Sequence, residues 1–213
     1  MSAKLTSNQK RVLEIIYTYL EVSGFPPTIA DLKVELGVSS NQAVLNHLKA
    51  LEKKECIKRE EGQARGIRIL PFGYKEIERE PLIKVLGTGA AGPYLESYAD
   101  AFSCWMPLQK GILQNEQIRR CEDGLFAIQV HGDSMINVGI DDGDYLLVKK
   151  TDEFKSNDIV VARRESETTV KRFIADGGKR YLKPENPNYE NIPIIPGEIF
   201  FDGKVILNLS KIK

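Results

Sequence analysis

Apolar residues in the first fifty positions recur every three or four residues, which is typical of helices that bury one face. Thr6 and Gln9 form a capping-box pattern at the start of the first run, and Gly37 is a natural stop after the second. The three predicted helices run from Thr6 to about Ser23, from Thr28 to Gly37 and from Ser40 to about Lys53.

The second and third helices form a helix-turn-helix arrangement, because both are short and a tight turn joins them. Residues 56–59 and 66–70 then alternate like two strands, which makes this head a winged helix-turn-helix domain over residues 1–70. In such domains the later helix of the pair enters the DNA major groove. Its outer face shows Asn41, Gln42, Leu45, Asn46 and Lys49, and these residues together with Ser40 and Ala43 are the candidate DNA contacts.

The chemistry of that face suits DNA bases. Gln42 and Asn46 carry amides that match adenine edges, and an exposed Leu45 matches a thymine methyl group. Residues 1–70 hold eleven Lys and Arg against eight Asp and Glu, whereas the whole chain has a net charge of +0. The head is therefore modestly basic, which favours an anionic partner. A helical bundle with a polar face and no DNA role remains the alternative.

The pattern changes after residue 70. Residues 71–80 contain proline, glycine and a charged run, which predicts an exposed linker. Strand-like apolar runs then predict a mainly-β body over residues 81–213, so that the fold class is α+β. These runs lie at residues 81–86, 125–130, 140–148, 168–173 and 205–207.

Composition restricts the class of protein. No run of about 18 apolar residues is present, so no membrane span is expected, and the first residues have no apolar signal region. Three cysteines without metal or redox spacing fit a reducing cytoplasm better than a disulfide scaffold. The two histidines are too few for a histidine-based metal site, and we expect neither a metal nor another cofactor.

Ser134 is the candidate nucleophile of the body. It lies on a tight segment between two predicted strands, within the motif His131–Met135. A serine needs a base to become a nucleophile, and a desolvated lysine can be that base. Lys171 lies among apolar residues of another strand-like run. We therefore predict a Ser134–Lys171 dyad, although Gly-Asp-Ser is also common in turns.

Neighbouring residues suggest other chemistry that we consider weaker. His131 is close to Ser134 in the chain, but adjacent strand residues point to opposite faces, which disfavours it as the base. Asp133 is interpreted as a residue that stabilises the loop by hydrogen bonds. Asp141, Asp142 and Asp144 resemble a calcium loop, but the EF-hand spacing and its closing glutamate are missing.

Seven short segments carry recognisable motifs, namely Gly24–Thr28, His47–Leu51, Arg65–Arg68, Ala90–Gly92, Gly132–Met135, Asp142–Asp144 and Val170–Arg172. Together they resemble the LexA repressor family, and the resemblance covers essentially the whole chain. It implies a signal-peptidase-like body in which Ser134 is the nucleophile, Lys171 the general base and Ala91–Gly92 the bond that the protein cuts in itself.

The resemblance also implies a biological role. A cytoplasmic bacterial repressor of DNA-damage (SOS) genes would bind palindromic operators on the nucleoid as a dimer held through its C-terminal domain. Self-cleavage, stimulated by the RecA filament on single-stranded DNA, would separate head from body and end repression. Two departures stand out: Asn41, Leu45 and Asn46 differ from the best-known members, and the stretch before Ser134 is longer.

Three alternatives stay open. A phage-type repressor would carry the same self-cleaving body. A winged-helix protein with an inert β-rich sensor body would bind DNA without cutting itself. A peptidase that cuts other proteins would use the head only for localisation, and the dependence of cleavage on protein concentration separates it from a self-cleaving chain.

Overall fold

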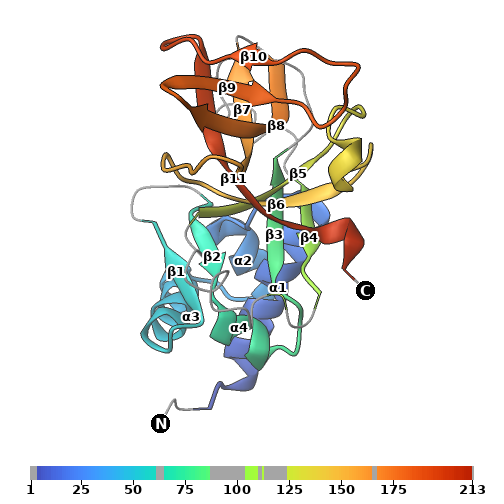
Figure 1. Ribbon diagram of the computed structural model, residues 1–213. Helices are drawn as coiled ribbons and strands as arrows, with labels where there is room; N and C mark the ends of the chain where they lie inside the picture. The colour runs from blue at the N-terminus through green and yellow to red at the C-terminus, as the bar shows by residue number, and fades with distance from the viewer. Residues whose placement is uncertain are drawn as a thin grey trace. The chain divides into compact units, whose positions relative to one another are not determined.

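The computed structural model of the protein describes residues 4–60, 65–86, 104–109, 112, 124–164 and 167–212 (Figure 1). The chain forms two compact units. Unit 1 comprises residues 1–83 and 104–112, and unit 2 comprises residues 84–103 and 113–213. The proposed cut bond Ala91–Gly92 lies outside the described residues, as do the tip of the head hairpin and most of the stretch before Gly124.

Unit 1 begins with three helices, α1 (Ser7–Ser23), α2 (Ile29–Leu36) and α3 (Asn41–Lys53). Thr6, Thr28 and Ser40 cap their first turns with side-chain oxygens, which satisfies backbone N–H groups that the helices cannot. The predicted capping box of Thr6 and Gln9 is present. One apolar core joins all three helices, which is why the 3.6-residue pattern predicted them correctly.

The head hairpin consists of β1 (Ile57–Arg59) and β2 (Ile67–Ile69), which pair antiparallel beside α3 (Figure 1). Ile57 and Ile69 join the helical core. The guanidinium of Arg65 lies 3.7 Å from the centre of the Phe25 ring, a cation–π contact that ties the wing to the connector after α1.

The predicted exposed linker is wrong for its first part. Residues Pro71–Glu76 form a short helix, α4, in which proline occupies a first-turn position. Tyr74 and Ile77 are buried in the core of unit 1. A side chain at Gly73 would collide with the carbonyl of Cys56, since a Cβ there would lie 2.3 Å from that oxygen. Glycine therefore lets α4 pack closely on the head.

Unit 1 also contains a segment from much later in the chain. β4 (Cys104–Pro107) contacts α1, and Trp105 packs against the core of the head. β4 is next to β3 (Leu82–Leu86) in the strand order, and β3 begins in unit 1 and ends in unit 2.

Unit 2 is built on one large sheet. From one side the order is β10, β9, β8, β7, β11, β6 and β5, followed by β3, which pairs parallel with β5. The last long strand thus lies inside the sheet and pairs antiparallel with both neighbours. The strands are β5 (Leu125–Gln129), β6 (Tyr145–Lys149), β7 (Ile159–Arg164), β8 (Glu167–Asp176), β9 (Lys179–Lys183), β10 (Ile192–Pro193) and β11 (Ile199–Asn208).

Two apolar clusters hold unit 2 together. One gathers Met135 and Ile140 from the loop after β5 onto buried residues of β5, β6, β7 and β8. The other surrounds Phe173 and Leu182, with the rings of Phe154 and Phe201 against Phe173. The helical head and the mainly-β body confirm the α+β class.

Candidate functional site: a serine and a buried lysine in unit 2

The loop after β5 presents Ser134. Val130 donates its N–H to the carbonyl of Asp144 and accepts from Gly143, so the chain stays paired for one residue beyond β5. Gly132 then adopts a positive φ of 84°, which a side chain would disfavour. The short 3-10 helix η3 (Ile136–Val138) follows at once. The buried Met135 anchors this turn beside Ser134.

Lys171 comes from β8 and reaches Ser134 across 37 positions of sequence. Its Nζ lies 2.7 Å from Ser134 Oγ, 2.6 Å from Thr169 Oγ1 and 3.0 Å from the carbonyl oxygen of Val170. Thr169 and Lys171 are two residues apart on one strand, and such residues share a face of the sheet. The two residues predicted as a dyad are therefore in direct contact, while their catalytic role stays a prediction.

The environment of Lys171 favours a neutral amine. Its side chain is buried in unit 2, with only 7% of the residue exposed. Burial lowers the pKa of Lys171 from 10.5 to about 8, because removal from water disfavours the charged ammonium. A lysine with this pKa has a substantial neutral fraction in mildly alkaline solution.

The three hydrogen-bond partners of Lys171 Nζ are compatible with a neutral amine, which has one lone pair and can act as a base. A neutral amine has two N–H bonds to donate and one lone pair to accept a proton. Thr169 Oγ1 and the Val170 carbonyl can accept the two N–H bonds, so the lone pair is left for the Ser134 hydroxyl. This arrangement matches what general-base activation of a serine requires.

The segment after β9 holds the Ser134 loop from one side. Asn186 Nδ2 donates to both the carbonyl and the carboxylate of Asp133, each at 3.1 Å, and the Tyr189 hydroxyl donates to the same carboxylate. Glu185 N donates to the carbonyl of Ser134 at 2.8 Å. Asp133 thus has the loop-stabilising role predicted for it, and the residue before Ser134 is fixed through both main chain and side chain.

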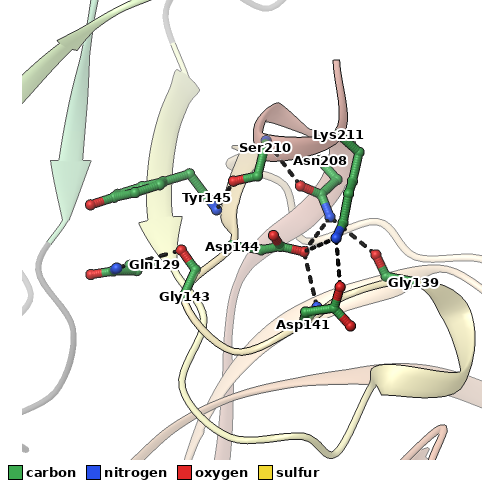
Figure 2. Close-up of polar contacts among 9 residues, drawn as sticks. All are labelled: Gln129, Gly139, Asp141, Gly143, Asp144, Tyr145, Asn208, Ser210 and Lys211. Atoms are coloured by element: carbon green, nitrogen blue, oxygen red, sulfur yellow. Dashed lines mark hydrogen bonds and ion pairs between the residues drawn. The ribbon is translucent and has the colours of Figure 1, made fainter. Parts of the chain in front are cut away.

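A second turn holds the same loop from another direction. Asp142 Oδ1 accepts from Gly132 N at 2.7 Å. Figure 2 shows the neighbouring residues Asp141 and Asp144 of this turn in contact with Asn208 and Lys211. Asn208 Nδ2 donates to Asp144 Oδ2 at 2.8 Å, and Lys211 Nζ lies 2.5 Å from Asp141 Oδ2. The three aspartates therefore serve as hydrogen-bond acceptors in a loop support.

Two alternative readings of this region are not supported by the geometry. The His131 side chain is 63% exposed and its Nδ1 lies 3.8 Å from the carboxylate of Asp142. Among the described residues no hydrogen bond joins it to Ser134. Among the same residues, no group of three or more His, Cys, Asp or Glu side chains could hold a metal ion.

Sequence reasoning missed several residues around the Ser134–Lys171 pair. Thr169 could have been found, because residues two apart on a predicted strand share a face. Asn186, Glu185 and Tyr189 could not, since their approach to Asp133 depends on the turn that follows β9.

Helix α3 presents most of the predicted DNA-contacting residues. Asn41, Gln42, Asn46 and Lys49 are exposed. Gln42 Nε2 donates to Asn46 Oδ1 at 2.9 Å, so these amides form one pair on the surface. The expectation of an exposed Leu45 is wrong, because this residue is half-buried, as is Ala43. Ser40 caps the helix, because its Oγ accepts a hydrogen bond from Ala43 N.

Comparisons with known proteins match two families to successive parts of the chain. The LexA DNA binding domain family matches residues 2–66, and the Peptidase S24-like family matches residues 81–206. Within the described residues, every helix is too short or too polar to cross a lipid bilayer.

Curated relatives match along nearly the whole chain. The LexA repressor of Geobacter sp. (strain M21) is 36% identical over 205 residues, covering 95% of this chain and 96% of the relative. The LexA repressor of Geobacillus kaustophilus (strain HTA426) is 36% identical over 207 residues, with coverage of 95% and 96%. That of Alcanivorax borkumensis (strain ATCC 700651 / DSM 11573 / NCIMB 13689 / SK2) is 34% identical over 203 residues, with coverage of 95% and 94%.

A DNA-binding head and a serine-peptidase body on one chain define a repressor class that carries its own peptidase domain. The chain belongs to the LexA repressor family.

Proposed function

We propose that this repressor controls DNA-damage (SOS) genes and is inactivated when it cuts its own Ala91–Gly92 bond with Ser134 and Lys171. The observation that carries the proposal is the 2.7 Å contact between Lys171 Nζ and Ser134 Oγ at a buried lysine. Membership of the LexA family supplies the biological setting.

The reaction is acyl transfer. Neutral Lys171 takes the proton of the Ser134 hydroxyl while Oγ attacks the Ala91 carbonyl, and the protonated lysine then gives a proton to the departing Gly92 amine. Water hydrolyses the resulting ester and regenerates Ser134. Backbone amides of the Ser134 loop are candidate donors to the oxyanion, and their rigidity rests on the contacts from Asn186 and Asp142. The reaction requires no metal or other cofactor.

The head binds operator DNA and the body holds two chains together. Two α3 helices on one dimer would read the halves of a pseudo-palindromic operator, with Gln42 and Asn46 on base edges and Lys49 toward phosphate. Linking two half-site contacts raises affinity through effective concentration. A head without its body therefore binds too weakly to keep genes repressed.

Control of cleavage requires a partner. A peptidase that carries its own substrate must rest mainly in a state that does not cut, and a partner that binds the cutting state shifts the population. By family membership we propose that this partner is the RecA filament on single-stranded DNA in the bacterial cytoplasm. A phage-type repressor is the alternative, and the full-length matches to bacterial LexA repressors favour the host type.

The repressor part of the proposal is tested with DNA selected from a random-sequence pool. Purified intact chain should enrich pseudo-palindromic sites, and its affinity for them should fall after incubation under alkaline conditions that permit cleavage. Ser134→Ala treated in the same way should keep its affinity. Selected DNA without two-fold symmetry would contradict the dimeric mode, and unchanged affinity after complete cleavage and separation of the fragments would contradict inactivation by cleavage.

A further inference from the structure

The chain exchanges segments between its two units around the proposed cut bond. Residues 84–86 precede Ala91–Gly92 but belong to unit 2, whereas residues 104–112 follow it but belong to unit 1. We call residues 104–112 the exchanged segment, of which 104–109 and 112 are described. A single cut at Ala91–Gly92 would leave each fragment with a piece packed in the unit of the other.

The exchanged segment is attached to the head by its indole. Trp105 Nε1 donates to the carbonyl oxygen of Gly24 at 2.8 Å, and the side chain packs against the core of unit 1. Gly24 is the residue that caps α1, and it adopts the left-handed conformation. The indole therefore donates to a backbone carbonyl at the C-terminal end of α1, beyond the hydrogen bonds within the helix.

The backbone of the exchanged segment adds a hydrogen bond, and two of its apolar residues are buried. Leu108 and Ile112 are buried, at 3% and 8% exposure. Leu108 N also donates to the carbonyl of Pro81 at 2.8 Å, so the segment is hydrogen-bonded to backbone that lies before the cut. Burial of apolar side chains and satisfied backbone groups both oppose release into water.

The reciprocal attachment is made by β3. It pairs with β5 through Val85 opposite Ala127 and Leu86 opposite Ile128. Val85 is buried, and Leu86 packs against an apolar cluster of unit 2. Each unit therefore holds a short piece of chain from the other side of the proposed cut bond.

We infer that the surface at the C-terminal end of α1 is a binding site for the exchanged segment, and that it holds the two fragments together after cleavage. Hydrolysis of Ala91–Gly92 breaks none of the contacts of Trp105 or Leu108. Loss of the head from the body is then a second step, undocking of the exchanged segment, which follows the chemical step. The inference rests on the proposed cut site and adds a delay between cutting and derepression.

Gel filtration of the self-cleaved chain tests this inference. After alkaline cleavage and return to neutral pH, the wild-type fragments should co-elute and separate slowly. Trp105→Ala should release the head at least about tenfold faster, because it removes both the packing and the donor. Trp105→Phe, which keeps an aromatic ring but lacks the N–H, should release it about fivefold faster. Val34→Ala, at an exposed position of α2, is the matched control and should change nothing.

The outcomes separate the inference from the proposed function. Wild-type fragments that part as fast as they form would overturn the inference, and so would co-eluting fragments whose release Trp105→Ala does not accelerate. A chain that never cuts itself contradicts the proposed function instead.

Docking of the exchanged segment is measured in the Ser134→Ala variant, which stays uncut. Trp105 is the single tryptophan of the sequence. Its fluorescence should be protected from acrylamide, and Leu108→Ala should remove that protection. Quenching of Trp105 to the extent of free tryptophan in the parent chain would overturn the inference.

Discussion

Lys171 Nζ lies 2.7 Å from Ser134 Oγ, and its other two hydrogen bonds go to neutral oxygens of Thr169 and Val170. Burial is the cause of its lowered pKa, so the same feature that destabilises the ammonium also makes the amine available as a base.

The rate of self-cleavage should follow the neutral fraction of Lys171. We expect the rate to rise with pH through a midpoint near 8, the pKa that burial gives this lysine, and to level off above it. The measurement is the first-order rate constant of fragment formation from pH 6 to 10, without any partner. A rate that is flat over this range would contradict a lysine base.

The free energy of unfolding should depend on pH in a way that reflects the same lowered pKa of Lys171. The folded pKa of about 8 lies below the ordinary value of 10.5, so between these pH values the unfolded chain holds more protons and wild-type stability rises with pH. Lys171→Met should therefore be more stable than its parent at pH 7, and the difference should shrink by roughly 3 kcal/mol up to pH 10.5. Urea unfolding is compared in a Ser134→Ala background, which prevents cleavage. A difference that does not change with pH would argue against a buried, perturbed lysine.

Asn186 should matter for rate through the position of Ser134. It is buried and bonds both the carbonyl and the carboxylate of Asp133. Asn186→Ala should lower the plateau rate about tenfold to a hundredfold, since small displacements of a nucleophile are costly. The pH midpoint should stay near 8, because Lys171 is untouched.

The matched control is Asn188→Ala, two residues away and exposed, which should cleave at the wild-type rate. A shift of the midpoint in Asn186→Ala would mean that Asn186 acts on Lys171 and not on the loop.

Much of the fold followed from sequence periodicity, and the reasons are local. The helices of the head were predictable because Thr6, Thr28 and Ser40 cap runs with helical spacing. The strand containing Lys171 was predictable from its apolar neighbours. The burial of α4 was not, since it depends on the approach of Gly73 to the Cys56 carbonyl, which no local pattern encodes.

Some contacts at the candidate site could not be predicted for the same reason, namely that no local pattern encodes them. Ser134 and Lys171 could be paired by their chemistry, because few residue types can activate a serine. The contact of Asn186 with Asp133 and the contact of Trp105 with Gly24 join segments that are far apart in the chain. Such contacts are set by the packing of each unit, so one sequence does not reveal them.

Base preference should depend on the amide pair of α3. Gln42 and Asn46 are hydrogen-bonded to each other and exposed. Gln42→Ala should weaken binding to the preferred operator by roughly 1–3 kcal/mol and relax preference at one base position in each half-site. Affinities for a set of single-base operator variants measure this at fixed salt. Glu14→Ala, exposed on α1, serves as control, and an unchanged ranking of the variants in Gln42→Ala would exclude a base contact.

The central claim is that Ser134 and Lys171 cut the chain at Ala91–Gly92, and intact-mass spectrometry of purified protein tests it most directly. Wild-type chain and exposed-lysine control Lys179→Ala, incubated at pH 9, should each yield two fragments, residues 1–91 and 92–213. Ser134→Ala and Lys171→Ala should stay whole while still binding operator DNA. Fragments from either of these two variants, or wild-type cleavage at a different bond, would contradict the account.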